Sequence, residues 1–380
     1  MLVPCGGCTL CCRDTDISLL HADDSASFSM MDSGGQQVIE RTPDGACVYL
    51  GGTGCTIHDR KPMMCRAMDC RPLAHVLTAD QALALEPDRL CRLDVWRRGH
   101  SMLTEMTDNE IQERVTDMTN FAELVAAERR IDEAFARHER VVLQFSGGKD
   151  SLACLYLIRP HWHKVTVAWC NRGAEFPETE AVIERIKQLP LGGFVEVRPP
   201  VPQPLSIQQH GLPVDVLPLG NTIFYGYATG KERTGVLVQE YLACCNRLLF
   251  QPLANFVREY GATLVIRGQR SSEEMVGPIR DGAVEGGVEY LLPLETWGRG
   301  SVIAYLKQQG VELPPSYQHV RKSLDCWGCT AFLGESQLSY LKEFHPDKWK
   351  VVADRLLKIK RALQPDMDNL EAAISLIERG

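Results

Sequence analysis

An apolar segment followed by a glycine turn constrains the fold of this chain more than any other feature. The segment 141–145 (VVLQF) suits a central strand of a parallel sheet, and Ser146-Gly147-Gly148 can turn tightly while leaving backbone N–H groups unpaired. A helix is expected from Lys149 to about Ile158, and its positive dipole end would point at the same turn. Ser146, Lys149 and Ser151 add hydroxyl and cationic donors. The stretch therefore predicts a pyrophosphate-binding loop.

Two common phosphate-binding motifs do not describe this loop. Walker A requires a glycine where the chain has Leu143, and there is no GxGxxG. The residues Ser146-Gly147-Gly148-Lys149-Asp150-Ser151 resemble the PP-loop of ATP pyrophosphatases and of their relatives, the sulfonucleotide reductases. The resemblance implies a bound nucleotide, either ATP with Mg²⁺ or an adenylyl sulfate, and catalytic roles for Lys149 and Asp150. A strand–turn–helix corner of small packing residues is the alternative.

Composition indicates a globular protein of two or three domains. The 380 residues are 44% hydrophobic and 24% charged, which is enough for a sizeable core. There is no run of eighteen apolar residues and no secretory signal, so we expect a cytoplasmic protein without a membrane span. The net charge of −8 gives no overall attraction to nucleic acid, although a local basic groove is compatible with it.

Fifteen cysteines in a reducing compartment indicate metal or redox chemistry rather than disulfides. Twelve of them form two sets that are far apart in the sequence, and Cys91, Cys154 and Cys170 belong to neither set. The first set consists of Cys5, Cys8, Cys11, Cys12, Cys47, Cys55, Cys65 and Cys70, and the second of Cys244, Cys245, Cys326 and Cys329.

The first set lies in a segment with few long apolar runs, so metal ligation would supply stability that its core cannot. Eight thiolates exceed one tetrahedral site. The spacing CxxCxxCC and the later segment 55–66 resemble a cysteine-rich family described as zinc- or iron-chelating, although His58 stands where a tyrosine is usual and Lys61-Pro62 replaces Arg-Pro. Spacing does not separate zinc from an iron–sulfur cluster, and reduced structural thiols are the alternative.

After the loop, helices and strands alternate as in a doubly wound, mostly parallel α/β sheet. Strands are expected at 164–169, 194–198 and 263–266, and a helix at 178–189. Residues 198–239 are expected to form an extended loop. Such sheets bind ligands at the carboxyl ends of their strands.

Two of these strand ends carry further signals. Phe176-Pro177-Glu178-Thr179 resembles an element of the phosphoadenylyl sulfate reductases, although an ordinary helix start has the same pattern. The segment 267–270, with Arg267, Gly268 and Arg270, resembles the part of that family that holds the nucleotide or its sulfate. We expect Arg280 to add a further anion donor and Glu178 to lie at the substrate. Pairing of the arginines with Glu273 and Glu274 on a surface loop is the alternative.

The second cysteine set joins a vicinal pair to a distant Cys-x2-Cys. Zinc sites rarely use vicinal cysteines, so the pattern favours a [4Fe–4S] cluster over zinc. It resembles the cluster site of the adenylylsulfate reductases, and the resemblance covers about residues 138–333. Cys170, at the end of a strand, is a candidate reactive thiol.

The chain departs from the sulfonucleotide reductases in two respects. No cysteine follows Cys329, where those enzymes carry a nucleophilic thiol, and residues 347–380 are expected to form two helices. The loop is also intact, whereas the reductases have degraded Ser-Gly-Gly motifs. Both departures favour an enzyme that adenylates its substrate with ATP and then replaces AMP by sulfur.

This reading implies a sulfur donor such as a cysteine desulfurase or a thiol carrier, and nucleic acid is one acceptor that related families suggest. A sulfonucleotide reductase that releases sulfite, and a non-catalytic nucleotide or iron–redox sensor, are the alternatives. The expected domains are 1–95 (cysteine-rich), 96–138 (helical connector), 139–333 (PP-loop) and 334–380 (C-terminal helices). The sequence does not determine the oligomeric state.

Overall fold

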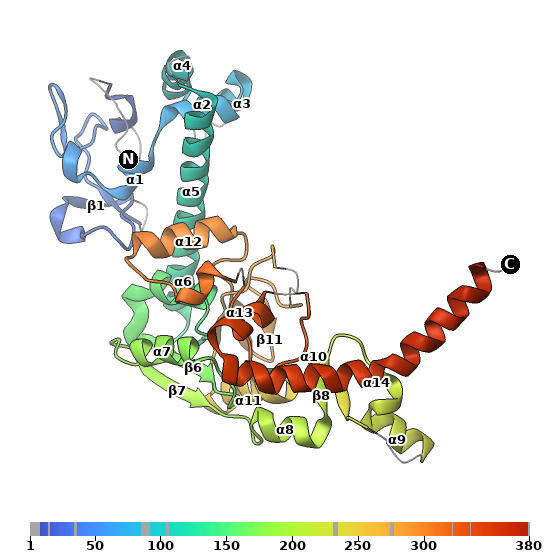
Figure 1. Ribbon diagram of the computed structural model, residues 1–380. Coiled ribbons are helices and arrows are strands. Elements are labelled where there is room, and N and C mark those ends of the chain that lie inside the picture. The colour runs from blue at the N-terminus through green and yellow to red at the C-terminus, as the bar shows by residue number, and fades with distance from the viewer. Residues whose placement is uncertain are drawn as a thin grey trace. The chain divides into compact units, whose positions relative to one another are not determined.

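The computed structural model describes residues 8–13, 16–33, 36–84, 92–103, 106–230, 235–273, 277–320, 322–334 and 336–378. The chain forms two compact units, residues 1–133 and 134–380. Figure 1 shows their elements, and helix α5 (Asp108–Arg137) contains the boundary between them. Cys5 lies outside the described residues.

The first unit contains two small antiparallel hairpins and four short helices. Its buried apolar side chains are few, among them Ile17, Val38 and Ile57, in agreement with the small core that the sequence predicts. The elements are β1 (Met30–Ser33), β2 (Gln36–Ile39), β3 (Leu50–Gly51), β4 (Gly54–Cys55), α1 (Met63–Ala67), α2 (Cys70–Val76), α3 (Ala79–Ala84) and α4 (Leu93–Met102).

Helix α5 begins with a reciprocal side-chain cap. The Glu110 N–H donates to the Thr107 hydroxyl (3.3 Å), and the Thr107 N–H donates to the Glu110 carboxylate (2.8 Å). This exchange satisfies two backbone donors that a helix start leaves unpaired. On the buried side of the helix lie Leu124 and Ile131, as the helical spacing predicts.

The second unit is built on a six-stranded, mostly parallel sheet of order β11-β12-β10-β5-β6-β7. Only β11 is antiparallel to its neighbour. The strands are β5 (Val141–Gln144), β6 (Val165–Cys170), β7 (Gly193–Val197), β10 (Leu264–Ile266), β11 (Val284–Glu285) and β12 (Val288–Leu291). The predicted α/β fold and its four predicted strands are confirmed. Strands β11 and β12, at one end of the sheet, were not predicted, because both are short and partly exposed and lack a buried apolar run.

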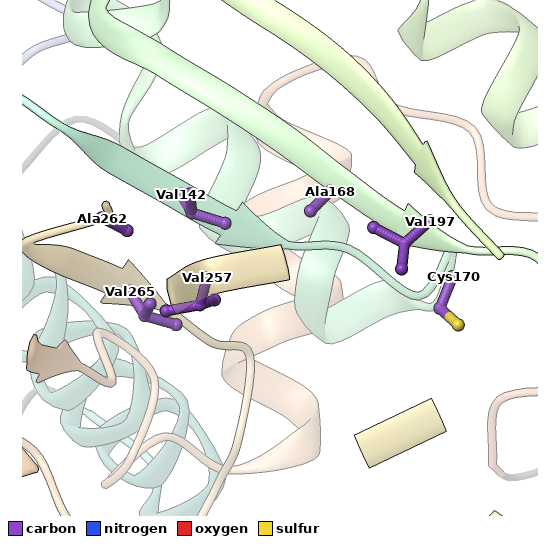
Figure 2. Packing of buried hydrophobic residues seen from close by; sticks show 7 residues of the cluster. All are labelled: Val142, Ala168, Cys170, Val197, Val257, Ala262 and Val265. Atoms are coloured by element: carbon purple, nitrogen blue, oxygen red, sulfur yellow. The ribbon is translucent and has the colours of Figure 1, made fainter. Parts of the chain in front are cut away.

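One face of this sheet forms a continuous apolar core. Alternate residues of adjacent strands point the same way, so Val142, Ala168 and Val265 lie together beside Val257 of helix α11 (Gln251–Tyr260), as Figure 2 shows. Helix α11 packs against β6 and β7. This packing fixes where strands β5, β6 and β10 end, and therefore where the loops that follow them lie.

The remaining helices connect and extend the sheet. They are α6 (Lys149–Leu157), α7 (Pro177–Ile186), α8 (Gln203–His210), α9 (Ile223–Thr229), α10 (Tyr241–Cys245), α12 (Arg299–Gln308), α13 (Gln337–Phe344) and α14 (Pro346–Glu378), with a π-helical turn at Asn246–Phe250.

The extended loop predicted for residues 198–239 is wrong. This stretch contains α8 and α9, and β8 (Leu212–Val214) pairs in parallel with β9 (Val238–Glu240). Its prolines misled the prediction: Pro204 occupies the first turn of α8, where a missing N–H is harmless. Val214 and Val238 pack with Ile359 of α14 in a small separate core.

The two helices predicted for residues 347–380 are also wrong, because α14 is one helix with Pro365 inside it. Figure 1 shows a bend in α14, and an internal proline is the usual cause of a sharp kink. Within the described residues, no helix is both long and apolar enough to cross a membrane.

Substitution of Gly99 by alanine should destabilise the first unit. Helix α4 crosses α2 so closely that a Cβ on Gly99 would lie 1.9 Å from the Cys70 carbonyl oxygen, which belongs to the backbone and cannot turn away. We expect a loss of about 1 to 3 kcal/mol in the free energy of unfolding, measured by urea denaturation. Ser101→Ala, at an exposed position of the same helix, is the control and should change stability by less than about 0.5 kcal/mol. A tolerated G99A would contradict the close approach.

Candidate functional site

The phosphate loop lies where the strand order of the sheet reverses. From β5 the chain proceeds to β6 and β7 on one side, whereas β10 pairs with β5 on the other. The loops after β5 and β10 therefore meet at the carboxyl ends of adjacent strands. Open α/β sheets bind their ligands in this crevice.

The loop has the conformation that its glycines permit. Gly147 has φ of +81°, a left-handed value that other residues rarely adopt. The Ser146 hydroxyl accepts from the Gly148 N–H (3.3 Å) and contacts the Ser151 hydroxyl (3.2 Å), which in turn donates to the Gly148 carbonyl (2.9 Å). The two serines thus hold the turn against the start of α6.

A buried carboxylate joins the two loops. Asp150 accepts from the Lys149 ammonium at Oδ2 (2.5 Å) and from Arg270 Nε at Oδ1 (2.8 Å). All three side chains are buried. Arg270 also donates to the Ser272 hydroxyl (3.0 Å) and lies 3.6 Å from Glu273. One carboxylate therefore aligns two cations beside the phosphate loop.

Gly268 allows this contact to form. A Cβ at Gly268 would lie 2.6 Å from the backbone carbon of Asp150 and 2.7 Å from the Ser151 nitrogen. Its neighbour Arg267 donates to the Gln144 side chain (2.6 Å) and stacks over the Tyr290 ring at 4.9 Å. Burial lowers the pKa of Arg267. The predicted residues Gly268 and Arg270 thus lie at the loop, and Arg267 lies against the ends of β5 and β12.

Two residues that the sequence did not single out cover the loop. The Lys149 N–H donates to the Tyr317 hydroxyl (2.8 Å), and this hydroxyl contacts the Ser323 hydroxyl (2.9 Å). Burial raises the pKa of Tyr317. Both residues lie more than 160 positions after the loop and carry no motif of their own.

Glu178, predicted to lie at the substrate, begins α7 beside the loop. It accepts from the Tyr340 hydroxyl (2.5 Å) and lies 2.9 Å from the His345 ring nitrogen. Burial raises its pKa, but the hydrogen bonds from Tyr340, from its own N–H and from His345 outweigh burial and lower the pKa overall. The other carboxylate oxygen is buried and has no hydrogen-bond partner in the described part of the chain.

The four downstream cysteines converge from two elements. Cys244 and Cys245 end α10, and Cys326 and Cys329 form a turn closed by the Cys329 N–H on the Cys326 carbonyl (3.1 Å). Burial raises the pKa of all four thiols, that of Cys245 to about 11 and that of Cys329 to about 12. The charges of Cys244 and Cys245 also raise the pKa of Cys329, which indicates that the two pairs lie near each other, although no three of the four sulfur atoms lie within 4.8 Å of one another in the structure.

A buried ion pair lies beside this site and was not predicted. Arg172 donates to Glu175 through Nε and Nη2, both at 2.8 Å. The next residues hold the cysteine turn, because the Trp327 N–H donates to the Ala174 carbonyl (3.0 Å). Burial raises the pKa of Cys326, and the Arg172 guanidinium opposes this rise. Arg172 is therefore a cation close to the thiols.

Two other predicted residues lie away from these contacts. Cys170 is buried, donates to the Leu248 carbonyl (3.2 Å) and has its pKa raised by burial to about 12. Such a thiol is protonated at neutral pH, so its surroundings disfavour a nucleophilic role. Arg280 is mostly exposed and donates to the Gly277 carbonyl (2.7 Å) rather than to a loop residue.

In the first unit, the cysteines divide into groups. Burial is the largest cause that raises the pKa of Cys65. The charges of Cys47, Cys12 and Cys55 raise it as well, and its pKa is about 12. The Cys47 N–H donates to the Cys12 carbonyl (2.9 Å), and Cys55 pairs with Leu50 in the β3–β4 hairpin. Cys70, at the start of α2, has its pKa raised by burial, by Asp69 and by Cys8.

These groups fit the chemistry of a metal-binding domain. Cys12, Cys47, Cys55 and Cys65 supply four thiols, which is the number that a tetrahedral thiolate site requires, although no three of these sulfur atoms lie within 4.8 Å of one another in the structure. Buried thiols with raised pKa values do not ionise readily without a nearby cation. A bound metal ion would supply the positive charge that stabilises the thiolates. Cys8 and Cys70 lie near each other as a separate pair.

Glu178→Gln should destabilise the protein in a pH-dependent manner. Because the folded pKa of Glu178 is below its ordinary value of 4.5, its charged form stabilises the fold above that pH, and this contribution is lost as the pH falls through the folded pKa. We expect E178Q to cost about 1 kcal/mol at pH 7 and less at pH 4, measured by urea denaturation.

The control is Glu180→Gln, which changes an exposed carboxylate in the same helix turn. Its small effect should be similar at both pH values. An E178Q deficit that is equal at pH 7 and pH 4 would show that the Glu178 charge does not stabilise the fold.

Two family models match this sequence. Residues 4–91 match the CxxCxxCC zinc- or iron-chelating domain, and residues 140–194 match the phosphoadenosine phosphosulfate reductase domain. Adenosine 5'-phosphosulfate reductase of Deinococcus radiodurans is 23% identical over 201 residues, which are 52% of this chain and 69% of that protein.

A solved structure is also similar, the phosphate complex of phosphoadenylyl-sulfate reductase from Candida auris. It is 16% identical with a TM-score of 0.38, and the match covers 53% of this chain and 88% of that one. The matched segment 140–194 contains strands β5 and β6, the phosphate loop and Glu178. Residues 140–194 are therefore similar to the phosphoadenosine phosphosulfate reductase domain, and residues 4–91 to the CxxCxxCC domain.

Proposed function

We propose that this enzyme binds ATP over Ser146–Ser151 and transfers sulfur to a substrate that it first activates as an adenylate. The observation that carries the proposal is the joining of the loop to two aligned cations, Lys149 and Arg270, through Asp150. The helix start and these cations together supply the positive field that a triphosphate requires. Cleavage between the α- and β-phosphates gives pyrophosphate as the leaving group, and the loop would hold it.

Each loop residue has a role in this scheme. The N–H groups of Gly148 and Lys149 would donate to phosphate oxygens, and the Lys149 ammonium would neutralise charge that develops on the leaving pyrophosphate. Asp150 orients both cations rather than acting as a base, since each of its oxygens already accepts from one of them. Mg²⁺ would be held chiefly by the phosphates themselves.

The four downstream thiols fit a [4Fe–4S] cluster. Cys326 and Cys329 pack with apolar neighbours, including Ala174 and Phe332, which would exclude water from a cluster. When bound there, a cluster would supply a site that carries or polarises sulfur. Arg172 would compensate part of the negative charge of the thiolates, and Glu175 would hold Arg172 in place.

Sulfonucleotide reduction is the second candidate, and the relative from Deinococcus radiodurans favours it. In this case the loop and Arg270 would bind an adenylyl sulfate. One external thiol would attack its sulfur and release AMP, and a second thiol would then displace sulfite as a disulfide forms. The two activities give different products. Purified protein should form AMP and pyrophosphate from ATP with a competent acceptor under the first proposal, and sulfite from adenylyl sulfate under the second.

Lys149→Met should lower the rate of either reaction about 100-fold or more, because it removes a preorganised cation from the developing charge. Lys164→Met is the matched control, since Lys164 is partly exposed and pairs only loosely with Glu139 (3.5 Å). AMP or sulfite release is measured for both variants. Equal rates for K149M and the unsubstituted protein would contradict a role for Lys149 in the chemistry.

Cys326→Ala should remove the iron of the downstream site. Protein purified without oxygen is analysed for iron and sulfide and by electron paramagnetic resonance. We expect C326A to lose the signal of a [4Fe–4S] cluster, because one of four ligands is missing, whereas Cys8→Ala should retain it. Retention of that signal by C326A and its loss in C8A would assign the cluster to the first unit instead.

A further inference from the structure

A pair of hydroxyl groups stands where a phosphate would bind the loop. Lys149 is the first residue of helix α6, so its N–H has no acceptor within the helix. This N–H donates to the Tyr317 hydroxyl at 2.8 Å. This hydroxyl is held by Ser323 at 2.9 Å. Helix N-terminal N–H groups are the usual donors to a phosphate, so Tyr317 occupies the acceptor position of a ligand.

The backbone of the loop is covered as well. A Cβ placed on Gly148 would lie 2.2 Å from the Ser323 hydroxyl oxygen, so this side chain rests directly on the glycine. Between the loop and the residues above it there remains a cavity of about 10 Å³. That volume holds at most one water molecule, whereas ligand clefts usually measure hundreds of Å³.

The covering residues belong to one stretch, which we call the cover segment (residues 314–320 and 322–324). Besides Tyr317 and Ser323, its members Pro314, Ser316 and Leu324 line the same cavity. The segment follows α12 and comes directly before the Cys326–Cys329 turn. It therefore covers Gly148 and Lys149, whereas Ser146 of the loop is exposed, and it adjoins the second cysteine set.

We propose that the cover segment is a displaceable gate, in which Tyr317 and Ser323 hold the phosphate position until a nucleotide phosphate takes the Lys149 N–H from Tyr317. The exchange is favourable because a phosphate oxygen is a charged acceptor and binds an N–H more strongly than a phenol does. The proposal rests on the proposed function, which supplies the nucleotide. It adds that affinity for phosphate is set by a competing side chain as well as by the loop.

The gate can move without disturbing the cysteines. The Asp325 N–H donates to the Gln337 side chain (2.8 Å), and the Thr330 hydroxyl donates to the Pro213 carbonyl (2.6 Å). These bonds anchor the Cys326–Cys329 turn at both ends. Movement of the cover segment would end before Asp325 and would open the contacts of Val320 and Leu324 in the core cluster with Phe176 and Tyr340.

Removal of the Tyr317 hydroxyl tests the gate. Binding of pyrophosphate to the full chain is measured by titration calorimetry for the unsubstituted protein and for Tyr317→Phe. We expect Y317F to bind about five-fold more tightly, because the closed state loses the hydrogen bond with which the ligand competes. Tyr260→Phe is the control. It also removes a bonded hydroxyl, which contacts Thr166 at 2.8 Å near the amino end of β6, whereas the loop lies at the carboxyl ends of the strands, so it should leave the affinity unchanged.

Unchanged or weaker binding of pyrophosphate by Y317F would contradict the gate. Weaker binding would show that Tyr317 contributes to binding, and unchanged binding would show that it has no effect. Ser323→Ala, which should also tighten binding, serves if Y317F does not fold. Hydrogen exchange gives a second measurement: amides of the cover segment should exchange several-fold faster when pyrophosphate is bound, and slower exchange would contradict displacement. Failure of every variant and of the unsubstituted protein to bind pyrophosphate or ATP would refute the proposed function together with the gate.

Discussion

The site depends on one buried carboxylate, Asp150, held between Lys149 and Arg270. Burial of a charge costs several kcal/mol unless it is paired and hydrogen-bonded, so this arrangement needs both cations in place. Arg270 reaches Asp150 only because β10 lies beside β5 and because Gly268 lets the two backbones approach. The structure of the phosphate loop therefore depends together on the sheet order, on Gly268 and on the ion pairs of Asp150.

The two cysteine sets depend on a different physical effect, the burial of their thiols. In both, burial raises thiol pKa values, so neutral thiols are stable in the fold while thiolates require a compensating cation. A metal ion or cluster would provide that compensation and would couple metal binding to the stability of each unit. The downstream set also has a nearby cation in Arg172, and the upstream set has Lys61 near Cys65 and Arg41 near Cys47.

Some local features could be read from the sequence because their causes are local. The glycines at 147 and 148, the apolar run before them and the helix start after them lie within eleven residues, and the capping pair Thr107 and Glu110 is three residues apart. The cysteine sets were visible from spacing. Composition misled where it stood in for structure, because the prolines of residues 198–239 suggested a loop.

The sequence by itself determined the α/β class, the phosphate loop and the two groups of cysteines, because periodicity and short motifs act between near neighbours. Only the tertiary structure decided what surrounds them. Tyr317, Ser323, Tyr340 and His345 reach the loop or Glu178 from more than 160 residues away, and Arg172 meets Cys326 across a similar gap. Such contacts arise from the order of strands and the packing of helices, so no local sequence pattern predicts them.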